Sequence, residues 1–112
     1  MIGNFGKTFF AVLITMAGPL SLSAQQTAKV TVSVKNHHFQ PAEIYAPANV
    51  PIELHVKNLD STLMEFESVS LRIEKVVTGN GEGIIRLRPL TPGRYEFFDD
   101  FRQETRGALV TK

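Results

Sequence analysis

The chain has 112 residues, with 12 Lys or Arg and 11 Asp or Glu, so its formal net charge is +1. This balance gives no electrostatic reason to expect nucleic acid or an anionic membrane surface as a partner. The sequence contains no cysteine, which excludes disulfides, thiolate metal ligands and attachment of a lipid through cysteine.

The first 24 residues have the pattern of an export signal. An apolar run at residues 8–17 follows Lys7 and is too short to span a bilayer, and small residues up to Ala24 supply a cleavage site. We therefore predict a cleaved signal peptide at 1–24, a mature domain at 25–112 and a periplasmic location, with the mature protein not embedded in the membrane. A permanent N-terminal anchor is the alternative.

From Val30 onward the apolar residues follow the period of β-strands. Val30, Val32 and Val34 alternate with polar residues, and residues 52–56 do the same, so both segments are predicted to be half-buried strands. His55 alternates with the apolar residues of its strand, which predicts a structural residue on the exposed face. Further strands are predicted at 43–45, 66–73, 84–88, 94–98 and 107–111.

Turn residues separate these predicted strands at 58–61, 78–81 and 91–93, and the Gly-Asn-Gly sequence within 78–81 is typical of a β-hairpin turn. No segment has a sustained 3.6-residue apolar period, so at most one helical turn is expected, near residues 60–63 or 102–105. About seven to eight short strands in one small domain predict an all-β fold, a Greek-key sandwich.

The sequence carries a resemblance to a known family. Pro92-Gly93 followed by Tyr95-x-Phe97 resembles the last hairpin of cupredoxins, the blue-copper β-sandwiches, in which this strand ends in the copper cysteine. Similarity to the EfeO-type cupredoxin-like domain extends over nearly all of residues 30–112. The segments that carry it include His38-Phe39-x-Pro41, Pro51-Ile52-x-Leu54-x-Val56-x-Asn58 and Glu65-Phe66-Glu67-Ser68.

This resemblance implies a cupredoxin-like fold and a role as a periplasmic accessory of ferrous iron uptake. The partners that it implies are an iron permease and a second periplasmic metal-binding protein. Likeness of fold does not transfer chemistry, so each copper-ligand position has to be compared with this sequence.

The copper-ligand positions of the resembled family are altered here. Asp99 stands at the position of the cysteine, and Glu65 lies near the position of a histidine. Phe101 and Arg106 stand in the loop that should supply a second histidine and a methionine. None of these residues rebuilds a site of two histidines and one cysteine, so a type 1 copper centre and its electron-transfer role are excluded.

Four carboxylates form the first set of candidate metal ligands: Glu65, Glu67, Asp99 and Asp100. Hard oxygen donors suit iron, manganese, calcium and magnesium. The resemblance implies that the strand and the loop that carry them meet at one end of the sandwich, where they are expected to converge on a cation. The alternatives are solvated loop acids, or a structural salt bridge from Glu67 to Arg94 or Arg72.

His37, His38 and Met64 form the second candidate set, for a weak copper site away from the type 1 position. Neighbouring residues of a strand point to opposite faces, so both histidines supply nitrogens only if the backbone turns there. One of them is expected to pack beside Phe39.

Three hypotheses for function follow. The leading one is a binding module that holds or presents a divalent metal, iron or copper, to an iron permease. The second is a metal-free docking domain for another periplasmic protein, which exposure of Phe98 or Phe101 would favour. The third is a copper-dependent ferrous oxidase component with a site that is not of type 1. No arrangement of nucleophile and base is recognisable, so a hydrolase is not expected.

Overall fold

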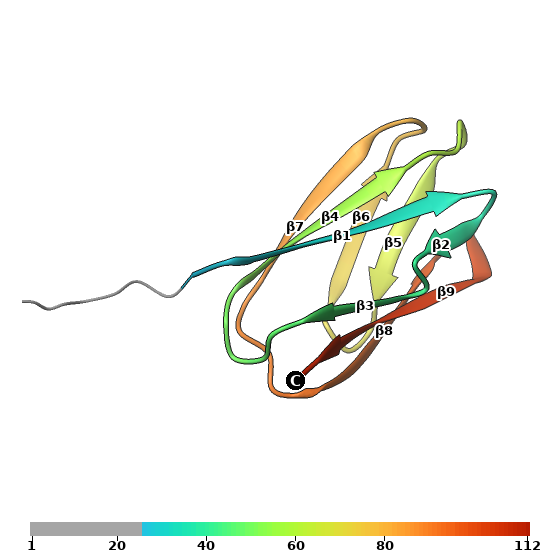
Figure 1. The fold of residues 1–112 in the computed structure, drawn as a ribbon. Coiled ribbons are helices and arrows are strands. Elements are labelled where there is room, and N and C mark those ends of the chain that lie inside the picture. Colours follow the sequence, from blue (N-terminus) through green and yellow to red (C-terminus); the bar gives the residue numbers. More distant parts are fainter. Residues whose placement is uncertain (1–25) are drawn as a thin grey trace, which may run out of the picture.

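The computed structural model describes residues 26–112, which form nine strands in two sheets (Figure 1). The predicted all-β sandwich is therefore confirmed, with nine strands in place of seven or eight. Within the described part of the chain, no helix is long and apolar enough to cross a membrane. The predicted signal peptide at 1–24 lies outside the described residues.

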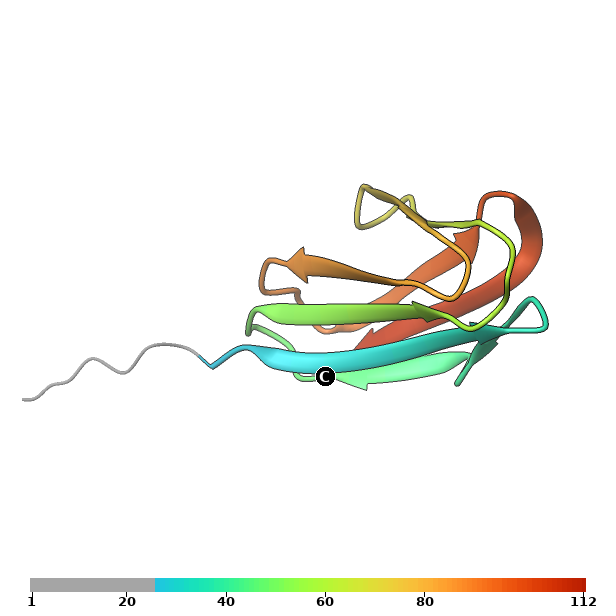
Figure 2. The ribbon, with the colours of Figure 1, turned by 90° about the horizontal axis from the view of Figure 1, so that it is seen from above.

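The strands in chain order are β1 (Ala28–Lys35), β2 (His38–Gln40), β3 (Glu43–Ala46), β4 (Ile52–Asn58), β5 (Met64–Ser68), β6 (Ile73–Val77), β7 (Glu82–Leu87), β8 (Gly93–Asp99) and β9 (Arg102–Thr111). The first sheet has the order β2-β1-β4-β7 and the second has the order β3-β9-β8-β5-β6. The pairs β1/β4 and β3/β9 are parallel, and the other pairs are antiparallel. Figure 2 shows the two sheets as stacked layers, and the crossovers between them fit a Greek-key sandwich.

The core lies between the sheets and is filled by alternate residues of the strands, as the period of two requires. Three aromatic rings connect the layers: Phe39 from the first sheet, and Phe66 and Phe97 from the second. The ring centroid of Phe97 lies 4.8 Å from that of Phe39 and 4.7 Å from that of Phe66. All three side chains are buried, so each contributes about 3 kcal/mol of hydrophobic stabilisation.

The prediction of one strand at 66–73 was wrong, because a turn at Val69–Arg72 divides the segment into β5 and β6. The backbone N–H of Arg72 donates to the carbonyl of Val69 over 3.2 Å. Arg72 has a φ of 58°, in the left-handed region that a strand does not use. The helical turn expected at 60–63 or 102–105 is absent from the described residues, and 102–105 belong to β9.

The turn at 78–81 is not the predicted hairpin turn, because it connects β6 in one sheet to β7 in the other. The buried side chain of Asn58 holds this crossing in place. Its Nδ2 donates to the carbonyls of Val77 and Thr78, at 3.2 and 3.1 Å, and to the carbonyl of Thr62 at 2.8 Å. A single buried amide thus links the β4–β5 connection to the end of β6 and the start of the β6–β7 connection.

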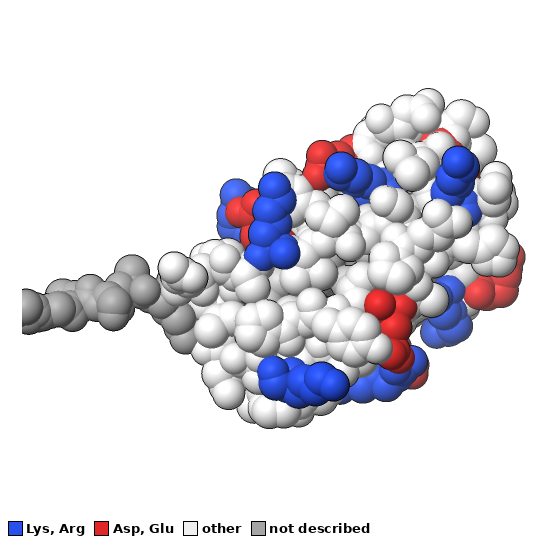
Figure 3. All heavy atoms as spheres, in the orientation of Figure 1, with Lys and Arg blue, Asp and Glu red and all other residues white. Residues whose placement is uncertain are grey.

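Charged side chains of both signs are interspersed on the face drawn in Figure 3. On the outer face of the first sheet, Lys29, Glu53 and Arg86 are neighbours in register across β1, β4 and β7. Arg86 lies 3.7 Å from Glu53. Such exposed cross-strand pairs contribute little to stability individually. Glu53 also contacts His55, which has closer charged partners.

His55 lies on the outer face of its strand beside Glu53, as predicted, but the expectation that it is exposed was wrong, because only 8% of it is exposed. Its Nδ1 lies 2.6 Å from Glu82 Oε2, and its Nε2 lies 2.6 Å from Glu53 Oε2. Carboxylates only accept hydrogen bonds, so both ring nitrogens donate and the ring is an imidazolium. The hydrogen bonds that His55 donates to Glu53 and, to a smaller extent, to Glu82 raise the pKa of His55, against the opposing effects of burial and of Lys29.

The folded-state pKa of His55 is raised above its ordinary value of 6.5. Its contribution to stability is therefore fully present below about pH 6.5 and is lost as the pH rises through the folded-state pKa. We expect His55→Gln to lower the midpoint of thermal unfolding at about pH 6 and to have a smaller effect at about pH 9. Thermal unfolding across this range measures the difference, and the exposed His38→Gln serves as control. An equal loss at both pH values would contradict the imidazolium assignment.

Gly107 lies where β9 passes closest to the aromatic core. A Cβ on Gly107 would lie 2.6 Å from Phe97 Cε1 and 2.7 Å from the Ala42 carbonyl oxygen. We expect Gly107→Ala to lower the free energy of unfolding by about 1–3 kcal/mol, since an overpacked core has to shift. Gly93→Ala, whose Cβ would meet nothing nearer than 3.7 Å, should change it by less than about 1 kcal/mol. Urea unfolding compares the two variants, and equal effects would contradict this explanation.

Candidate metal centre

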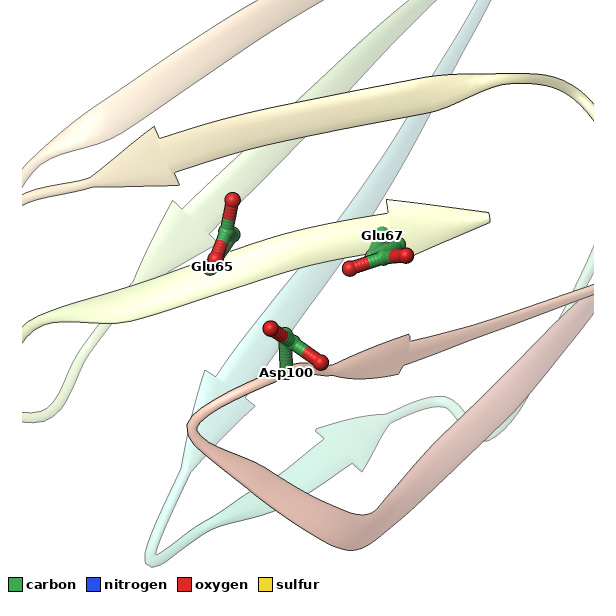
Figure 4. A group of neighbouring side chains, drawn as sticks. All are labelled: Glu65, Glu67 and Asp100. Carbon is green, nitrogen blue, oxygen red and sulfur yellow. The ribbon is translucent and has the colours of Figure 1, made fainter. Parts of the chain in front are cut away.

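Three carboxylates converge on the outer face of the second sheet. Glu65 and Glu67 project from β5, and Asp100 follows β8 in the adjacent turn (Figure 4). One oxygen of each carboxylate lies within 4.8 Å of the others. These three residues are called the acidic cluster below. Metal–oxygen bonds of 2.0–2.6 Å would allow one divalent cation to contact oxygens at this spacing.

Local strand geometry places the acidic cluster. On β5, Phe66 points into the core, so Glu65 and Glu67 on either side of it point outward. Asp100 lies in the turn after β8, and its carboxylate faces the two glutamates (Figure 4). The backbone N–H of Asp100 donates to the Glu65 carbonyl over 2.9 Å, which fixes the turn against β5.

The acidic cluster has no basic partner among the described residues. Burial, followed by repulsion from Glu74 and Asp100, raises the pKa of Glu65. Burial, followed by repulsion from Asp100 and Glu74, raises the pKa of Glu67. Both shifts result from partly desolvated negative charges held near one another, a condition that a bound cation relieves.

The alternative in which Glu67 pairs with an arginine was wrong. Arg94 instead pairs with Glu43, and its Nε lies 3.7 Å from Glu96. Arg72 forms no ion pair among the described residues, although it borders a hollow that Glu67 also lines. The partner of Glu67 across β5 and β6 is another acid, Glu74. Glu74 was not among the sequence candidates, because recognising it required the pairing register of these strands.

Asp99 is not part of the acidic cluster, because its carboxylate points inward and only 1% of the residue is exposed. Its Oδ1 accepts hydrogen bonds from the backbone N–H groups of Glu65 and Phe101, each over 3.0 Å. Asp99 thus joins the start of β5 to the turn after β8. The observed contacts of Asp99 are structural. They hold the backbone of Glu65, a member of the acidic cluster, and of Phe101, which directly follows Asp100.

The second candidate set is not assembled into a site. Met64 is 2% exposed and belongs to the core, whereas His37 and His38 are exposed. The backbone N–H of His37 donates to Asp60 Oδ2 over 3.0 Å, and its Nδ1 lies 3.4 Å from the same oxygen. His37 has a φ of 60°, so the backbone does turn there. His38, the first residue of β2, is paired with Lys35 of β1.

These residues do not fit the type 1 copper centre of cupredoxins. The sequence has no cysteine, and the side chain at the expected position, Asp99, is already engaged by two backbone donors. A thioether at Met64 is enclosed in the core, away from the exposed histidines. The donor set on the outer face contains oxygen only, which favours harder cations than copper.

Comparisons with known proteins agree with the fold. Residues 7–111 match the model of the family described as "Cupredoxin-like domain". A curated relative is "Uncharacterized protein RP394" of Rickettsia prowazekii, 42% identical over 82 residues, which are 73% of this chain and 66% of that protein. The match thus spans slightly less than two thirds of the length of this relative.

Similar solved structures are copper-binding proteins by their titles, although their low identities show the fold alone. The metal-binding domain of the Cu(I)-exporting P-type ATPase CopA from Streptococcus pneumoniae, solved with Cu(I), has a TM-score of 0.64 at 17% identity, covering 80% of this chain and 99% of that chain. Auracyanin A, a blue copper protein from Chloroflexus aurantiacus, has a TM-score of 0.64 at 10% identity, covering 78% and 100%. The purple cupredoxin of Nitrosopumilus maritimus has a TM-score of 0.56 at 13% identity, covering 76% and 99%.

The family match covers almost the whole chain. The two-layer arrangement of strands and the similar solved structures agree with it. The chain therefore belongs to the cupredoxin-like domain family.

Proposed function

We propose that this protein is an exported accessory of ferrous iron uptake, which binds a divalent cation at the acidic cluster and presents it to a membrane permease. The observation that carries the proposal is the convergence of Glu65, Glu67 and Asp100 on one outer face without a basic partner among the described residues. Three carboxylate oxygens are suitable donors for Fe(II) or Mn(II).

The position of the acidic cluster supports a carrier in preference to a store. The three residues are half-buried at a sheet surface, so a bound cation would keep open positions for water or for a partner's ligands. A site of this kind favours exchange over permanent retention, because few protein ligands hold the cation. The resemblance to the EfeO-type domain supplies the iron pathway, the permease, the second metal-binding protein and the periplasmic location as parts of the proposal.

A second candidate function, docking of a periplasmic protein, is favoured by the exposure of Phe101. Half of this residue is exposed, at 50%, and Leu63 is 46% exposed. Leu63 lies just before β5, and Phe101 lies between β8 and β9. Asp99 connects these two places, because it accepts hydrogen bonds from the backbone of Glu65 and of Phe101. Phe98 is instead covered by Arg106, whose guanidinium carbon lies 4.8 Å from the ring centroid. Partner binding that persists in a chelator would favour docking over metal presentation.

Anaerobic calorimetric titration with Fe(II), Mn(II), Cu(I) and Cu(II) tests the metal proposal. We expect one-to-one binding of Fe(II) or Mn(II), and a loss of about 100-fold in affinity in the double variant Glu65→Gln, Glu67→Gln, at about tenfold for each lost charged contact. Glu96→Gln, on the same sheet but outside the acidic cluster, is the matched control. Absence of binding by the folded wild-type protein would overturn the metal assignment and leave docking.

The repulsion within the acidic cluster predicts that function and stability oppose each other. The folded-state pKa of Glu67 is raised above its ordinary value of 4.5. Glu67 therefore ionises more readily in the unfolded state, and the folded state loses stability as the pH rises from about 4.5 through the folded-state pKa. We expect Glu67→Gln to raise the thermal midpoint of the metal-free protein at about pH 7, with no gain at about pH 3.5, while metal affinity falls. A lower midpoint at neutral pH would contradict this account of the acidic cluster.

Substitution of Asp99 separates its structural contacts from metal ligation. We expect Asp99→Ala to lower the free energy of unfolding by about 2 kcal/mol or more, because two backbone donors lose their acceptor. Asp99→Asn keeps an amide oxygen and should cost less. Urea unfolding and metal titration of Asp99→Asn together decide the question: an affinity reduced as far as in the Glu65, Glu67 double variant would make Asp99 a ligand.

A further inference from the structure

A second hollow, which no residue of the acidic cluster lines, opens near the other end of β8. Its volume is about 690 Å³, within the range typical of small-molecule sites. It is bordered by the β5–β6 turn and by the connection from β7 to β8, which both lie in the lower part of Figure 1. Tyr95, near the start of β8, lines it, whereas Asp100 of the acidic cluster follows the end of the same strand.

The lining of this hollow combines an apolar floor with a cationic rim. The floor consists of Leu71, Ile73, Leu87, Leu90 and Tyr95. Leu87 is buried, and the other four are partly buried against the core. The Tyr95 hydroxyl donates to the Thr91 carbonyl over 2.8 Å, so its hydrogen bond is satisfied by the protein itself. The rim carries three arginines, Arg72, Arg86 and Arg88, and no carboxylate lines the hollow.

The positive charge of the rim is largely uncompensated. Arg72 and Arg88 form no ion pair among residues 26–112, and Arg86 has only a contact of 3.7 Å with Glu53. A smaller hollow of about 390 Å³ on the outer face of the second sheet also contains two arginines. There, Arg94 is paired with Glu43, and Glu96 lines the hollow itself. The 690 Å³ hollow, in contrast, combines Arg72 and Arg88, which form no ion pair among the described residues, with a lining free of acids.

The backbone at Arg72 is a second and independent observation. Five described non-glycine residues have positive φ, and three of them are Asn, which tolerates this conformation well. Arg72 is the one long cationic residue in the set, with φ of 58°. A non-glycine residue in the left-handed region is strained, and such strain concentrates at ligand sites. The strained backbone of this turn places Arg72 on the rim of the hollow.

We propose that this hollow binds a small amphiphilic organic anion, with a carboxylate or phosphate head and an aliphatic or aromatic body. The head would lie among the guanidinium groups, which bind carboxylate and phosphate through paired hydrogen bonds. The body would cover the apolar floor beside Tyr95 and Leu90. The site is separate from the acidic cluster, so its existence does not depend on metal binding.

Two-dimensional NMR titration of the ¹⁵N-labelled protein tests the proposal, with octanoate and octyl phosphate as probes below their micelle-forming concentrations. We expect saturable shifts confined to residues 70–73, 86–90 and 95. Octanol and octyltrimethylammonium present the same body without a negative head, and citrate presents carboxylates without the body. All three should bind at least about tenfold more weakly, and the ratio of octanoate to octyl phosphate identifies the preferred head.

Variants test the arginines individually. Arg72→Asn removes the charge with a residue that accepts the left-handed backbone, and Arg88→Gln removes the second cation. Each should weaken octanoate or octyl phosphate binding about tenfold. Arg106→Gln, on the outer face of the second sheet, should leave it unchanged. Equal binding of octanol or of the cationic probe, shifts spread over the whole surface, or full affinity in a folded Arg72→Asn, Arg88→Gln double variant would each overturn the proposal.

Discussion

The packing of Phe66 against Phe39 and Phe97 is the constraint on which the rest of this structure depends. These rings connect the two sheets at the centre of the core, with centroid separations of 6.1 Å and 4.7 Å from Phe66. Once Phe66 points inward, the period of two along β5 directs Glu65 and Glu67 to the outer face. A shift of one residue in register would bury both carboxylates and expose the ring, so core packing fixes the position of the acidic cluster.

Buried polar groups organise the end of the sandwich where β5 begins and β8 ends. Asp99 accepts hydrogen bonds from the backbone N–H groups of Glu65 and Phe101. The side-chain amide of Asn58 donates to the carbonyls of Thr62, Val77 and Thr78. Each buried partner would be costly to leave unsatisfied. At the position where the resembled cupredoxins have a copper thiolate, the Asp99 carboxylate instead holds the backbone. The carboxylates of the acidic cluster lie outside, on the sheet surface.

Charge is distributed unevenly over a chain whose net charge is nearly zero. In the acidic cluster, burial and then repulsion between the carboxylates raise the pKa values of Glu65 and Glu67. The rim of the 690 Å³ hollow carries arginines that form no ion pair among the described residues. By contrast, His55 is held between two opposite charges, those of Glu53 and Glu82. Concentrated charge of one sign costs stability, and a ligand of the opposite charge is proposed at each of these two places.

The sequence by itself determined the all-β fold, the positions of most strands and the absence of a type 1 copper centre, because strand periodicity and residue identity are local properties. The sequence placed Asp99 and Asp100 together as candidate ligands, and only the structure separated the buried Asp99 from Asp100. Only the tertiary structure decided that Glu74 faces Glu67, that Glu82 reaches His55, and that Arg72 joins Arg88 around one hollow. These pairs depend on register between strands and on a turn that divides residues 66–73, and both are set by packing between segments distant in the chain.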